Sequence, residues 1–444
     1  MRVRITPRRF TRAVRVPASK SHTIRRLLLA ALGEGTSQID YPLDSLDSRS
    51  CLAVCRALGA DIAEHRAAER LVRWTVRGVG GAEGLHGKGE LLDAGNSGTT
   101  LFLAVAAASL GTGEFTFTGD EQIRRRSAAP LLAALRGLGA DVRSAEGGCA
   151  PVTVQGPWKG GRVSLSCPTS QYLSALLIAA PLAPAGTVTE IEVPLLNERP
   201  YIGLTLSYLR AQGVSWEVQG DYAAFRASGG AVYRPMNGPV PGDFSSAAFP
   251  ACAAAVSGGE VTLLGLDADD PQGDKAFFEF LRRMGCGVHG EPGRITVSRA
   301  GPLTGGEFDL NAVPDLLPVM AVMGAYAQGE TRLVNAAHAR IKETDRIAVM
   351  AAELSKLGVK VRERSDGLVI EGGEVSGGRL LQGHGDHRVA MALAVAALGA
   401  SGPVEIEGAE CAEVTYPGFW DLLREEDGAF PSCRARCRGE ARPS

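Results

Sequence analysis

Residues 17–33, PASKSHTIRRLLLAALG, join a proline-containing turn and small polar residues to a run of leucine and alanine. Five more stretches share this plan: AGNSGTTLFLAVAAAS from Ala94, CPTSQYLSALLIAAPLA from Cys167, PGDFSSAAFPACAAAV from Pro241, VPDLLPVMAVMGAYA from Val313 and HGDHRVAMALAVAALGA from His384. Steps of 77, 73, 74, 72 and 71 residues separate the anchors Ser19, Asn96, Thr169, Asp243, Asp315 and Asp386. This near-constant period predicts one supersecondary unit repeated six times, each opening a helix at its anchor.

A second pattern recurs in step with the first, a helix that ends in glycine before a strand. These glycines are Gly59, Gly139, Gly213, Gly285 and Gly358, and glycine ends helices because it adopts a left-handed backbone at low cost. Alternating stretches such as LVRWTVRG (71–78) and RITVSR (294–299) predict strands. Each unit should therefore read helix, strand, helix, strand, strand, an α/β fold whose first helix is apolar on most sides and buried beneath sheets.

The chain of 444 residues is too long for one ordinary core. The stretch 235–241, PMNGPVP, is the best linker and divides the six units three and three. We therefore predict a domain of three units over residues 19–240 and a discontinuous domain of three units over residues 1–18 and 241–428. Residues 429–444 are polar, basic and without periodicity, so we expect a disordered tail.

Composition disfavours several classes of protein. The net charge of −2 does not favour nucleic acid or an anionic membrane surface, and no apolar run approaches the ~20 residues of a membrane span. The nine cysteines are scattered without a C-x-x-C pair, which favours reduced thiols in a cytoplasm. The basic N-terminus is not followed by the apolar stretch of a signal peptide. We expect no metal and no cofactor, since the histidines show no metal-ligand spacing.

The six helix openings suggest a site for anions. A helix N-terminus presents free N–H groups and the positive end of the helix dipole. Helix capping alone would explain the serine, threonine, asparagine and aspartate residues there. It does not explain Lys20, Arg25 and Arg388, because a cation near an N-terminus opposes the dipole. Cations in these places indicate a bound anion.

A further cluster of charges lies in residues 336–346, AAHARIKETDR. On a helix, Lys342 and Arg346 would share one face, and Glu343 would lean on it. Such a cluster is either a solvated helix face with weak ion pairs or a place that binds an anion and moves a proton. The chain has no Walker A loop, no G-x-S-x-G and no strand-linked G-x-G-x-x-G, so nucleotide-binding and hydrolase interpretations lack support.

Ten motifs in order give the chain, from about Arg4 to Leu423, a resemblance to a known family. They are SKSHTIR (19–25), LDSLDSR (43–49), GNSGTT (95–100), TSQY (169–172), ERPY (198–201), GDFSSA (242–247), PD (314–315), KETDR (342–346), DHR (386–388) and TYPGFW (415–420). They resemble the motifs of 3-phosphoshikimate 1-carboxyvinyltransferases, the EPSP synthases. The resemblance implies two domains, each of three βαβαββ units in an inside-out α/β barrel, with a hinge that closes on substrate.

The resemblance also implies a reaction, transfer of the enolpyruvyl group of phosphoenolpyruvate to the 5-hydroxyl of shikimate 3-phosphate with release of phosphate. By position, the residues implied for shikimate 3-phosphate are Lys20, Ser21, Arg25, Thr169, Ser170, Gln171, Tyr201, His338 and Lys342, its 3-phosphate being held by Thr169, Ser170 and Lys342. Those implied for phosphoenolpyruvate are Lys20, Asn96, Gly98, Arg126, Arg346 and Arg388. Asp315 would accept the 5-hydroxyl proton, Glu343 would protonate the methylene carbon, and Lys20 would assist catalysis.

The chain departs from the family's pattern at several positions. Phe102 stands where an arginine is usual, Val414 where a lysine touches phosphate, and His338 where an asparagine contacts substrate hydroxyls. Glu198 replaces a serine that binds the 3-phosphate, and a carboxylate there would repel it. Ser127 replaces a proline.

These departures keep other functions open. One is an enolpyruvyl transferase with a different acceptor alcohol; another is a catalytically impaired or non-catalytic homologue, against which the retained Lys20, Asp315 and Glu343 argue. The related UDP-N-acetylglucosamine enolpyruvyl transferase is disfavoured, since Lys20-Ser21 stands where that enzyme has Lys-Asn. We expect a cytoplasmic monomer that binds small-molecule substrates, and neither nucleic acid nor a membrane.

Overall fold

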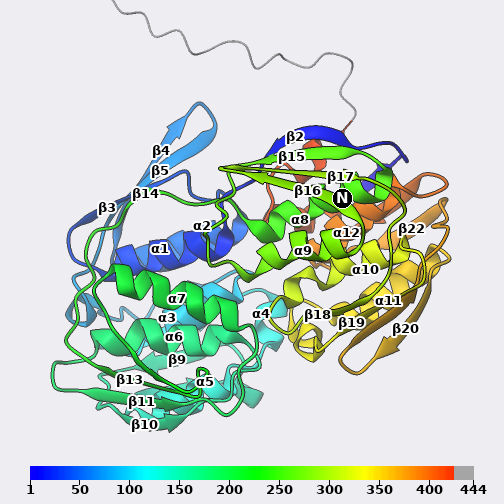
Figure 1. Ribbon diagram of the computed structural model, residues 1–444. Coiled ribbons are helices and arrows are strands. Elements are labelled where there is room, and N and C mark those ends of the chain that lie inside the picture. The colour runs from blue at the N-terminus through cyan, green and yellow to red at the C-terminus, as the bar shows by residue number, and fades with distance from the viewer. Residues whose placement is uncertain (425–444) are drawn as a thin grey trace, which may run out of the picture.

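The computed structural model describes residues 1–424, which fold into two lobes (Figure 1). The predicted tail from residue 429 lies outside the described residues. One lobe contains the blue, cyan and green elements on the left of Figure 1, and the other contains the N-terminal strands together with the green to red elements on the right. Small sheets form the outer faces, and helices lie between them.

The first lobe contains three repeats in sequence. The first has α1 (Lys20–Leu32), β3 (Thr36–Asp40), α2 (Leu46–Ala57), β4 (Asp61–Ala67) and β5 (Arg70–Arg77). The second has β6 (Leu91–Asp93), α3 (Gly98–Ala108), β7 (Phe115–Thr118), α4 (Glu121–Arg125), α5 (Ala129–Gly137), β8 (Asp141–Ser144) and β9 (Val152–Gln155). The third has β10 (Gly161–Ser164), α6 (Ser170–Ala179), β11 (Val188–Glu192), α7 (Arg199–Ala211), β12 (Glu217–Gln219) and β13 (Ala224–Ser228), and β14 (Asn237–Pro239) follows.

The second lobe starts at the N-terminus with β1 (Arg2–Ile5) and β2 (Thr11–Arg15). Its first repeat continues with α8 (Phe244–Ser257), β15 (Glu260–Leu264), α9 (Ala276–Arg283), β16 (Cys286–Glu291) and β17 (Arg294–Arg299). The next has β18 (Glu307–Asp309), α10 (Leu317–Ala325), β19 (Glu330–Val334), α11 (Arg346–Lys356), β20 (Lys360–Arg364) and β21 (Gly367–Glu371). The last has β22 (Arg379–Gln382), α12 (His387–Leu398), β23 (Val404–Glu407) and α13 (Phe419–Leu422).

One strand order recurs through the sheets. The orders β6-β7-β9-β8, β10-β11-β13-β12 and β18-β19-β21-β20 each place a parallel pair beside an antiparallel hairpin. Near the junction of the lobes, β14 supplies the first strand of β14-β3-β5-β4, and β2 supplies that of the sheet β2-β15-β17-β16. The predicted linker at 235–241 is therefore wrong in part, because its centre is strand β14. The repeated α/β unit is confirmed in five sheets, whereas the last repeat forms the three-stranded sheet β1-β23-β22, in which β1 pairs antiparallel with β23.

The chain crosses between the lobes twice, and the two crossings are hydrogen bonded to each other. The amide of Ser19 donates to the carbonyl of Pro241 at 2.8 Å, and the amide of Asp243 donates to that of Pro17 at 2.9 Å. Buried hydrophobic residues form one cluster from Ile24 to Val240 and a second that combines residues 5–16 with residues 244–423. Each lobe therefore has its own core, and the paired crossings join them.

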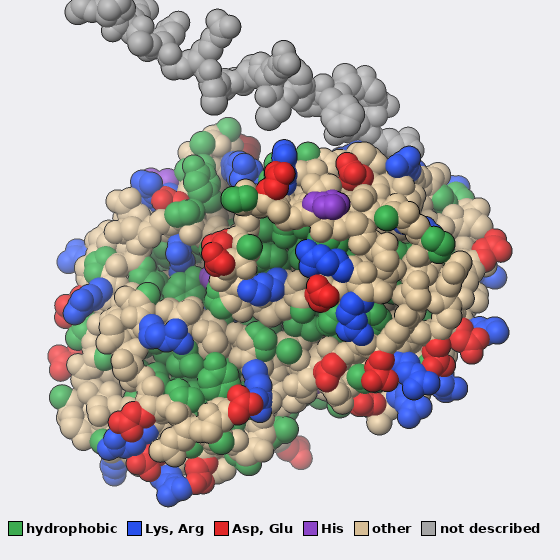
Figure 2. All heavy atoms as spheres, viewed as in Figure 1, with side chains coloured by type: hydrophobic (Ala, Val, Ile, Leu, Met, Phe, Trp, Pro, Cys, Tyr) green, Lys and Arg blue, Asp and Glu red, His purple; other side chains and the backbone are tan. Residues whose placement is uncertain are grey.

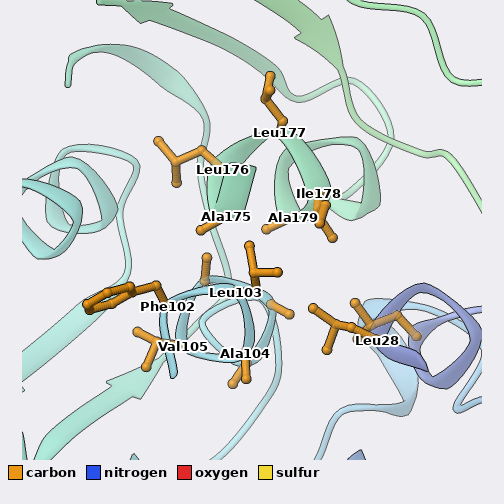
Figure 3. Packing of buried hydrophobic residues seen from close by; sticks show 14 of the residues in the cluster. Leu28, Phe102, Leu103, Ala104, Val105, Ala175, Leu176, Leu177, Ile178 and Ala179 are labelled. Carbon is orange, nitrogen blue, oxygen red and sulfur yellow. The ribbon is translucent and has the colours of Figure 1, made fainter. Parts of the chain in front are cut away.

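The repeat-opening helices form the centre of each core, as the sequence predicts. Every residue of α3 and α10 is buried. In Figure 3, Leu103 of α3 points toward Ala175 and Ala179 of α6, and Leu28 of α1 approaches from the side. Small side chains let these helices approach closely, and the sheets cover their other faces.

The helix caps follow the predicted anchors at four of the six openings. Ser19, Thr169, Asp243 and Asp386 occupy the N-cap positions of α1, α6, α8 and α12. At the second opening the cap is Ser97, whose hydroxyl accepts from the amide of Thr100, so the anchor Asn96 is one residue too early. At the fifth, Asp315 lies inside a 3-10 turn, η5 (Pro314–Leu316), that precedes α10. Its carboxylate is therefore free for tertiary contacts.

Helix ends and strands also follow the sequence patterns. The five predicted glycines have φ between 76° and 109°, just beyond α2, α5, α7, α9 and α11. The stretches expected as strands form β5 and β17. Positive and negative side chains are interspersed over the face shown in Figure 2, in keeping with the net charge of −2.

Candidate active site

A cavity of about 580 Å³ lies between the lobes. It is lined by twelve of the predicted residues: Lys20, Ser21, Arg25, Arg126, Thr169, Ser170, Gln171, Tyr201, Asp315, Lys342, Glu343 and Arg388. A larger cavity of about 1700 Å³ lies beside the crossings, and none of the predicted site residues is among its described lining residues. Size alone would select the larger cavity, but the charged side chains that chemistry requires converge on the smaller one.

The first turn of α1 brings a lysine and a buried arginine to this cavity. Lys20 Nζ donates to Asp47 Oδ2 at 3.0 Å. Arg25 lies deeper, where its guanidinium bonds Thr205 Oγ1 at 2.9 Å and Ser174 Oγ at 3.3 Å, and burial lowers its pKa to about 10. Lys20 therefore remains the group of α1 best placed to meet an anion in the cavity.

Sequence reasoning gave Asp47 no function, although it lies within the motif LDSLDSR. Its side chain is buried, and burial raises the pKa of its carboxyl, an effect that the neighbouring Lys20 partly offsets. A charged partner under Lys20 fixes the position of the ammonium. The motif LDSLDSR was the only feature of the sequence that could have indicated a role for Asp47, because its contact with Lys20 is a tertiary contact between α1 and α2.

The centre of the site is Arg346, whose side chain is 1% exposed and contacts three carboxylates. Its Nη1 donates to Asp315 Oδ1 at 2.7 Å, its Nη2 to Glu343 Oε2 at 2.6 Å and its Nε to Asp386 Oδ2 at 2.7 Å. Arg388 Nη2 lies 2.9 Å from the other oxygen of Asp315. One guanidinium therefore orients the predicted base, the predicted acid and the cap of α12.

The predicted helix across Lys342 and Arg346 is wrong. A 3-10 turn, η6 (Ala337–Ile341), ends before Lys342, and the chain then bends until Asp345 caps α11 at Arg346. Asp345 Oδ1 accepts from the amide of Ala348 at 3.0 Å, so the cap ends the bend and starts the helix. The bend directs Lys342 toward the first lobe while Glu343 stays on Arg346.

Both candidate proton-transfer groups are held in the ionised form. Burial raises the pKa of the Glu343 carboxyl, but the positive charges of Arg346 and Arg126 outweigh burial and hold the pKa well below its usual value. Burial likewise opposes ionisation of Asp315, and Arg388 and Arg346 bring its pKa below the usual range. An ionised Asp315 can accept a proton. Glu343 can act as an acid once an anionic ligand draws these cations away from it.

Arg126 reaches the same carboxylate from the first lobe. Its Nη2 lies 3.3 Å from Glu343 Oε1, yet its buried Nε and Nη2 make no hydrogen bond. Nearby, the side-chain Nε2 of Gln171 donates to Thr99 Oγ1 at 2.8 Å. A Cβ on Gly98 would lie 3.0 Å from Arg126 Nη1, so a larger residue at position 98 would crowd this guanidinium.

Four predicted residues lie outside the lining of the cavity: Asn96, Gly98, His338 and Arg346. The side-chain Nδ2 of Asn96 donates to Asp120 Oδ2 at 2.6 Å and to Gln122 Oε1 at 2.7 Å. His338 is buried, burial lowers its pKa, and its Nε2 has no hydrogen-bond partner. Arg346 is buried behind the cavity lining and affects the site through Asp315 and Glu343, the lining carboxylates that it contacts.

Two of the departures from the family pattern have a structural explanation. Phe102 lines the cavity and packs edge-on against Tyr172, with ring centroids 5.0 Å apart. An apolar contact therefore replaces the usual arginine at this wall. The carboxylate of Glu198 points into the predicted phosphate site, where it contacts Thr169, Ser170 and Lys342. Nothing in the structure explains Val414.

Asp274 is a second buried carboxyl that sequence reasoning missed. It lies inside a 3-10 turn, Gly273–Lys275, that precedes α9, and its Oδ2 accepts from the hydroxyls of Tyr201, at 3.2 Å, and Ser245. Burial raises the pKa of Asp274 to about 7, and the negative charge of Asp315 adds to this rise. No local pattern distinguishes this aspartate from its neighbours Asp267, Asp269 and Asp270.

We expect Asp274→Asn to flatten the pH dependence of stability. Because the pKa of Asp274 is raised on folding, the folded protein binds more protons between about pH 4 and 7, so stability falls as the pH rises through this range. Between pH 5 and pH 8 the free energy of unfolding should fall in both proteins, but the fall should be smaller in the variant by on the order of 2 kcal/mol. Urea unfolding at both pH values tests this, with the exposed Asp61→Asn as control. Equal slopes for wild type and variant would contradict it.

A metal site and a membrane-spanning helix are two other features that the described residues, 1–424, could contain. Among these residues no group of three or more histidine, cysteine, aspartate or glutamate side chains is arranged to hold a metal ion. Nor does any helix in this part of the chain have the length and apolar character needed to cross a bilayer.

Comparison with known proteins agrees with the geometry. The family description EPSP synthase (3-phosphoshikimate 1-carboxyvinyltransferase) matches residues 5–423. The chain is 47% identical to the 3-phosphoshikimate 1-carboxyvinyltransferase of Acetivibrio thermocellus over 421 residues, which cover 95% of this chain and 97% of that one. Identity to the enzyme of the same name from Ruminiclostridium cellulolyticum is 42% over 417 residues, covering 94% and 96%.

A solved structure extends the likeness to the fold. EPSP synthase from Acinetobacter baumannii superposes with a TM-score of 0.78 at 29% identity, and the match covers 95% of this chain and 97% of that one. The two lobes of repeated α/β units are thus those of the EPSP synthase fold. The chain belongs to the EPSP synthase (3-phosphoshikimate 1-carboxyvinyltransferase) family.

Proposed function

We propose that this chain transfers the enolpyruvyl group of phosphoenolpyruvate to the 5-hydroxyl of shikimate 3-phosphate and releases phosphate. The observation that carries the proposal is the pairing of Asp315 and Glu343 on one buried arginine, at 2.7 and 2.6 Å, in a cleft lined by cations from both lobes. Both substrates are phosphorylated carboxylates, so such a cleft suits them. The two carboxylates supply the base and the acid that the transfer needs.

In this mechanism the cations bind phosphoenolpyruvate and thereby alter the acid. Arg126 and Arg388 approach from opposite lobes, and the unbonded Nε and Nη2 of Arg126 can donate to the ligand's oxygens. An anion that engages Arg126 weakens the hold of that guanidinium on Glu343 and raises the pKa of this carboxyl. Glu343 would then protonate the methylene carbon and later remove a proton as the tetrahedral intermediate collapses.

Asp315 is the proposed base for the acceptor hydroxyl. It lies between Arg346 and Arg388, and these two guanidinium groups fix both carboxylate oxygens. Once phosphoenolpyruvate shares those cations, the basicity of Asp315 rises, and the proton of the 5-hydroxyl can pass to it. Lys20 supplies positive charge near the departing phosphate.

The acceptor would lie along α6 and α7. Ser21, Arg25, Gln171 and Tyr201 line the same cavity, and Tyr201 would pack on the acceptor ring. The acceptor contact implied for His338 would need a rearrangement, because its side chain is buried outside the cavity lining. The 3-phosphate is assigned to Thr169, Ser170 and Lys342.

The test is phosphate release by purified protein given both substrates, with each substrate omitted in turn. Release that requires both supports the proposal, and a folded protein that releases none would contradict it.

A cytoplasmic location is part of the proposal and is supported by the seven described cysteines, which are free thiols. A monomer stays a prediction, to be checked by light scattering.

A further inference from the structure

The carboxylate of Glu198 occupies a set of donors suited to a phosphate. Its Oε2 accepts from Thr169 Oγ1 at 3.1 Å, from the amide of Ser170 at 3.0 Å and from Ser170 Oγ at 2.7 Å. Its Oε1 pairs with Lys342 Nζ. The residue is 2% exposed. Two hydroxyls, a helix N-terminus and a lysine together form an anion site, and the anion that these donors hold here belongs to the chain itself.

The charges around Glu198 favour its ionised form. Burial raises the pKa of the Glu198 carboxyl, but Lys342 and the hydrogen bond from Ser170 outweigh burial and lower it. Two further titratable groups act on it, the imidazole of His338 and the guanidinium of Arg25. The pocket therefore stabilises one negative charge on this side chain.

The backbone of Glu198 is held in an unfavourable conformation. Its φ of 59° and ψ of 40° are left-handed, a region that costs a non-glycine residue free energy. Its amide donates to the carbonyl of Asn311 at 3.3 Å. A strained residue fixed by surrounding contacts can change conformation when those contacts are replaced.

The contacts of Glu198 also join the two lobes. Glu198 and Asn197 belong to the first lobe, whereas Lys342 and Asn311 belong to the second. Besides the ion pair, Asn311 Nδ2 donates to Asn197 Oδ1 at 3.1 Å. This side chain therefore makes a contact across the cleft that a ligand phosphate between the same donors could make instead.

We infer that Glu198 is a tethered anion that holds the cleft closed at the acceptor's phosphate subsite, and that the phosphate of the acceptor must displace it. The inference rests on the proposed function for the identity of the acceptor. A displaced carboxylate and an incoming phosphate repel each other, so Glu198 weakens acceptor binding. Phosphoenolpyruvate binds elsewhere in the cleft and should be little affected.

The experiment compares wild type with Glu198→Ser and with Glu198→Gln, which retains the side chain's size without its charge. The KM for shikimate 3-phosphate should fall about ten- to hundredfold in both variants, the range of one charge-assisted contact. The KM for phosphoenolpyruvate should change less than about threefold. Glu217→Ser, at an exposed carboxylate of β12, is the matched control and should leave both constants unchanged.

A direct binding measurement separates this inference from the proposed function. Calorimetry with shikimate 3-phosphate alone needs no turnover, so tighter binding by both variants supports displacement even if phosphate release fails. Small-angle scattering without ligand should show Glu198→Ser more open than the wild type, and addition of shikimate 3-phosphate should close it.

Other outcomes would overturn the inference. Unchanged or weaker binding of shikimate 3-phosphate by a folded Glu198→Gln would show that the carboxylate does not compete with the phosphate. Tighter binding of unphosphorylated shikimate than of shikimate 3-phosphate by the wild type would make Glu198 a permanent wall of the acceptor site, and the acceptor would then be a different alcohol.

Discussion

Glu343→Gln should leave the binding of both substrates near normal and lower kcat by about 10²–10⁴-fold, the usual range for a lost general acid. Glutamine fits the same space and can still accept the hydrogen bond that Arg346 Nη2 donates at 2.6 Å. It cannot deliver a proton to carbon. The loss should therefore fall on kcat rather than on KM.

Isotope exchange gives this prediction a sharper readout. If Glu343 protonates the methylene carbon and later removes a proton from the resulting methyl group, turnover in deuterated water must place deuterium in that carbon. The wild type should incorporate deuterium and Glu343→Gln should not. Glu371→Gln, at an exposed residue of β21, is the control. Turnover of Glu343→Gln within a few-fold of wild type would remove Glu343 from the proton transfer.

Much of the fold followed from the sequence because the signals were local. The period of the helix openings located all six buried helices, and glycine marked five helix ends. The misplacement at Asn96 came from choosing between two adjacent capping residues, of which Ser97 makes the bond to the amide of Thr100. The error at residues 342–345 was avoidable, since Asp345 before an apolar helical stretch is itself an N-cap signal.

The contacts within the site could not be predicted in the same way. The sequence named Asp315, Glu343 and Arg346, but their convergence on one guanidinium depends on how η5, η6 and α11 pack. Glu198 was expected to repel a phosphate. The structure instead places its carboxylate on the donors that a phosphate would use, a result that depends on tertiary contacts with α6 and Lys342 rather than on any local sequence pattern.

Arg346→Met should both abolish turnover and destabilise the protein, by about 3–5 kcal/mol, the usual cost of removing one partner from a buried ion pair. The substitution leaves Asp315, Glu343 and Asp386 without their shared cation. Asp386 also caps α12 through the amide of Arg388 at 2.9 Å, so its repulsion by the other carboxylates should loosen that helix as well. Arg346→Lys keeps the charge, but one ammonium cannot replace three directed donors.

The pH dependence of this loss distinguishes an electrostatic cause from a packing cause. In the wild type the pKa values of Asp315 and Glu343 are lowered on folding, so they add stability above about pH 4, the unfolded value, and lose it as the pH falls through their folded values. Without Arg346, each carboxyl loses one of the two cations that most strongly oppose the effect of burial, so both pKa values rise above those in the wild type and protonation of these carboxyls favours folding of the variant. The destabilisation of Arg346→Met measured by urea unfolding should therefore be largest at pH 7 and smaller at pH 4. The control is Arg362→Met, at an exposed arginine of β20, which should change stability by less than about 0.5 kcal/mol at either pH. A loss of equal size at both pH values would mean that Arg346 stabilises the fold by packing, and its charge would then have to be explained by the substrate alone.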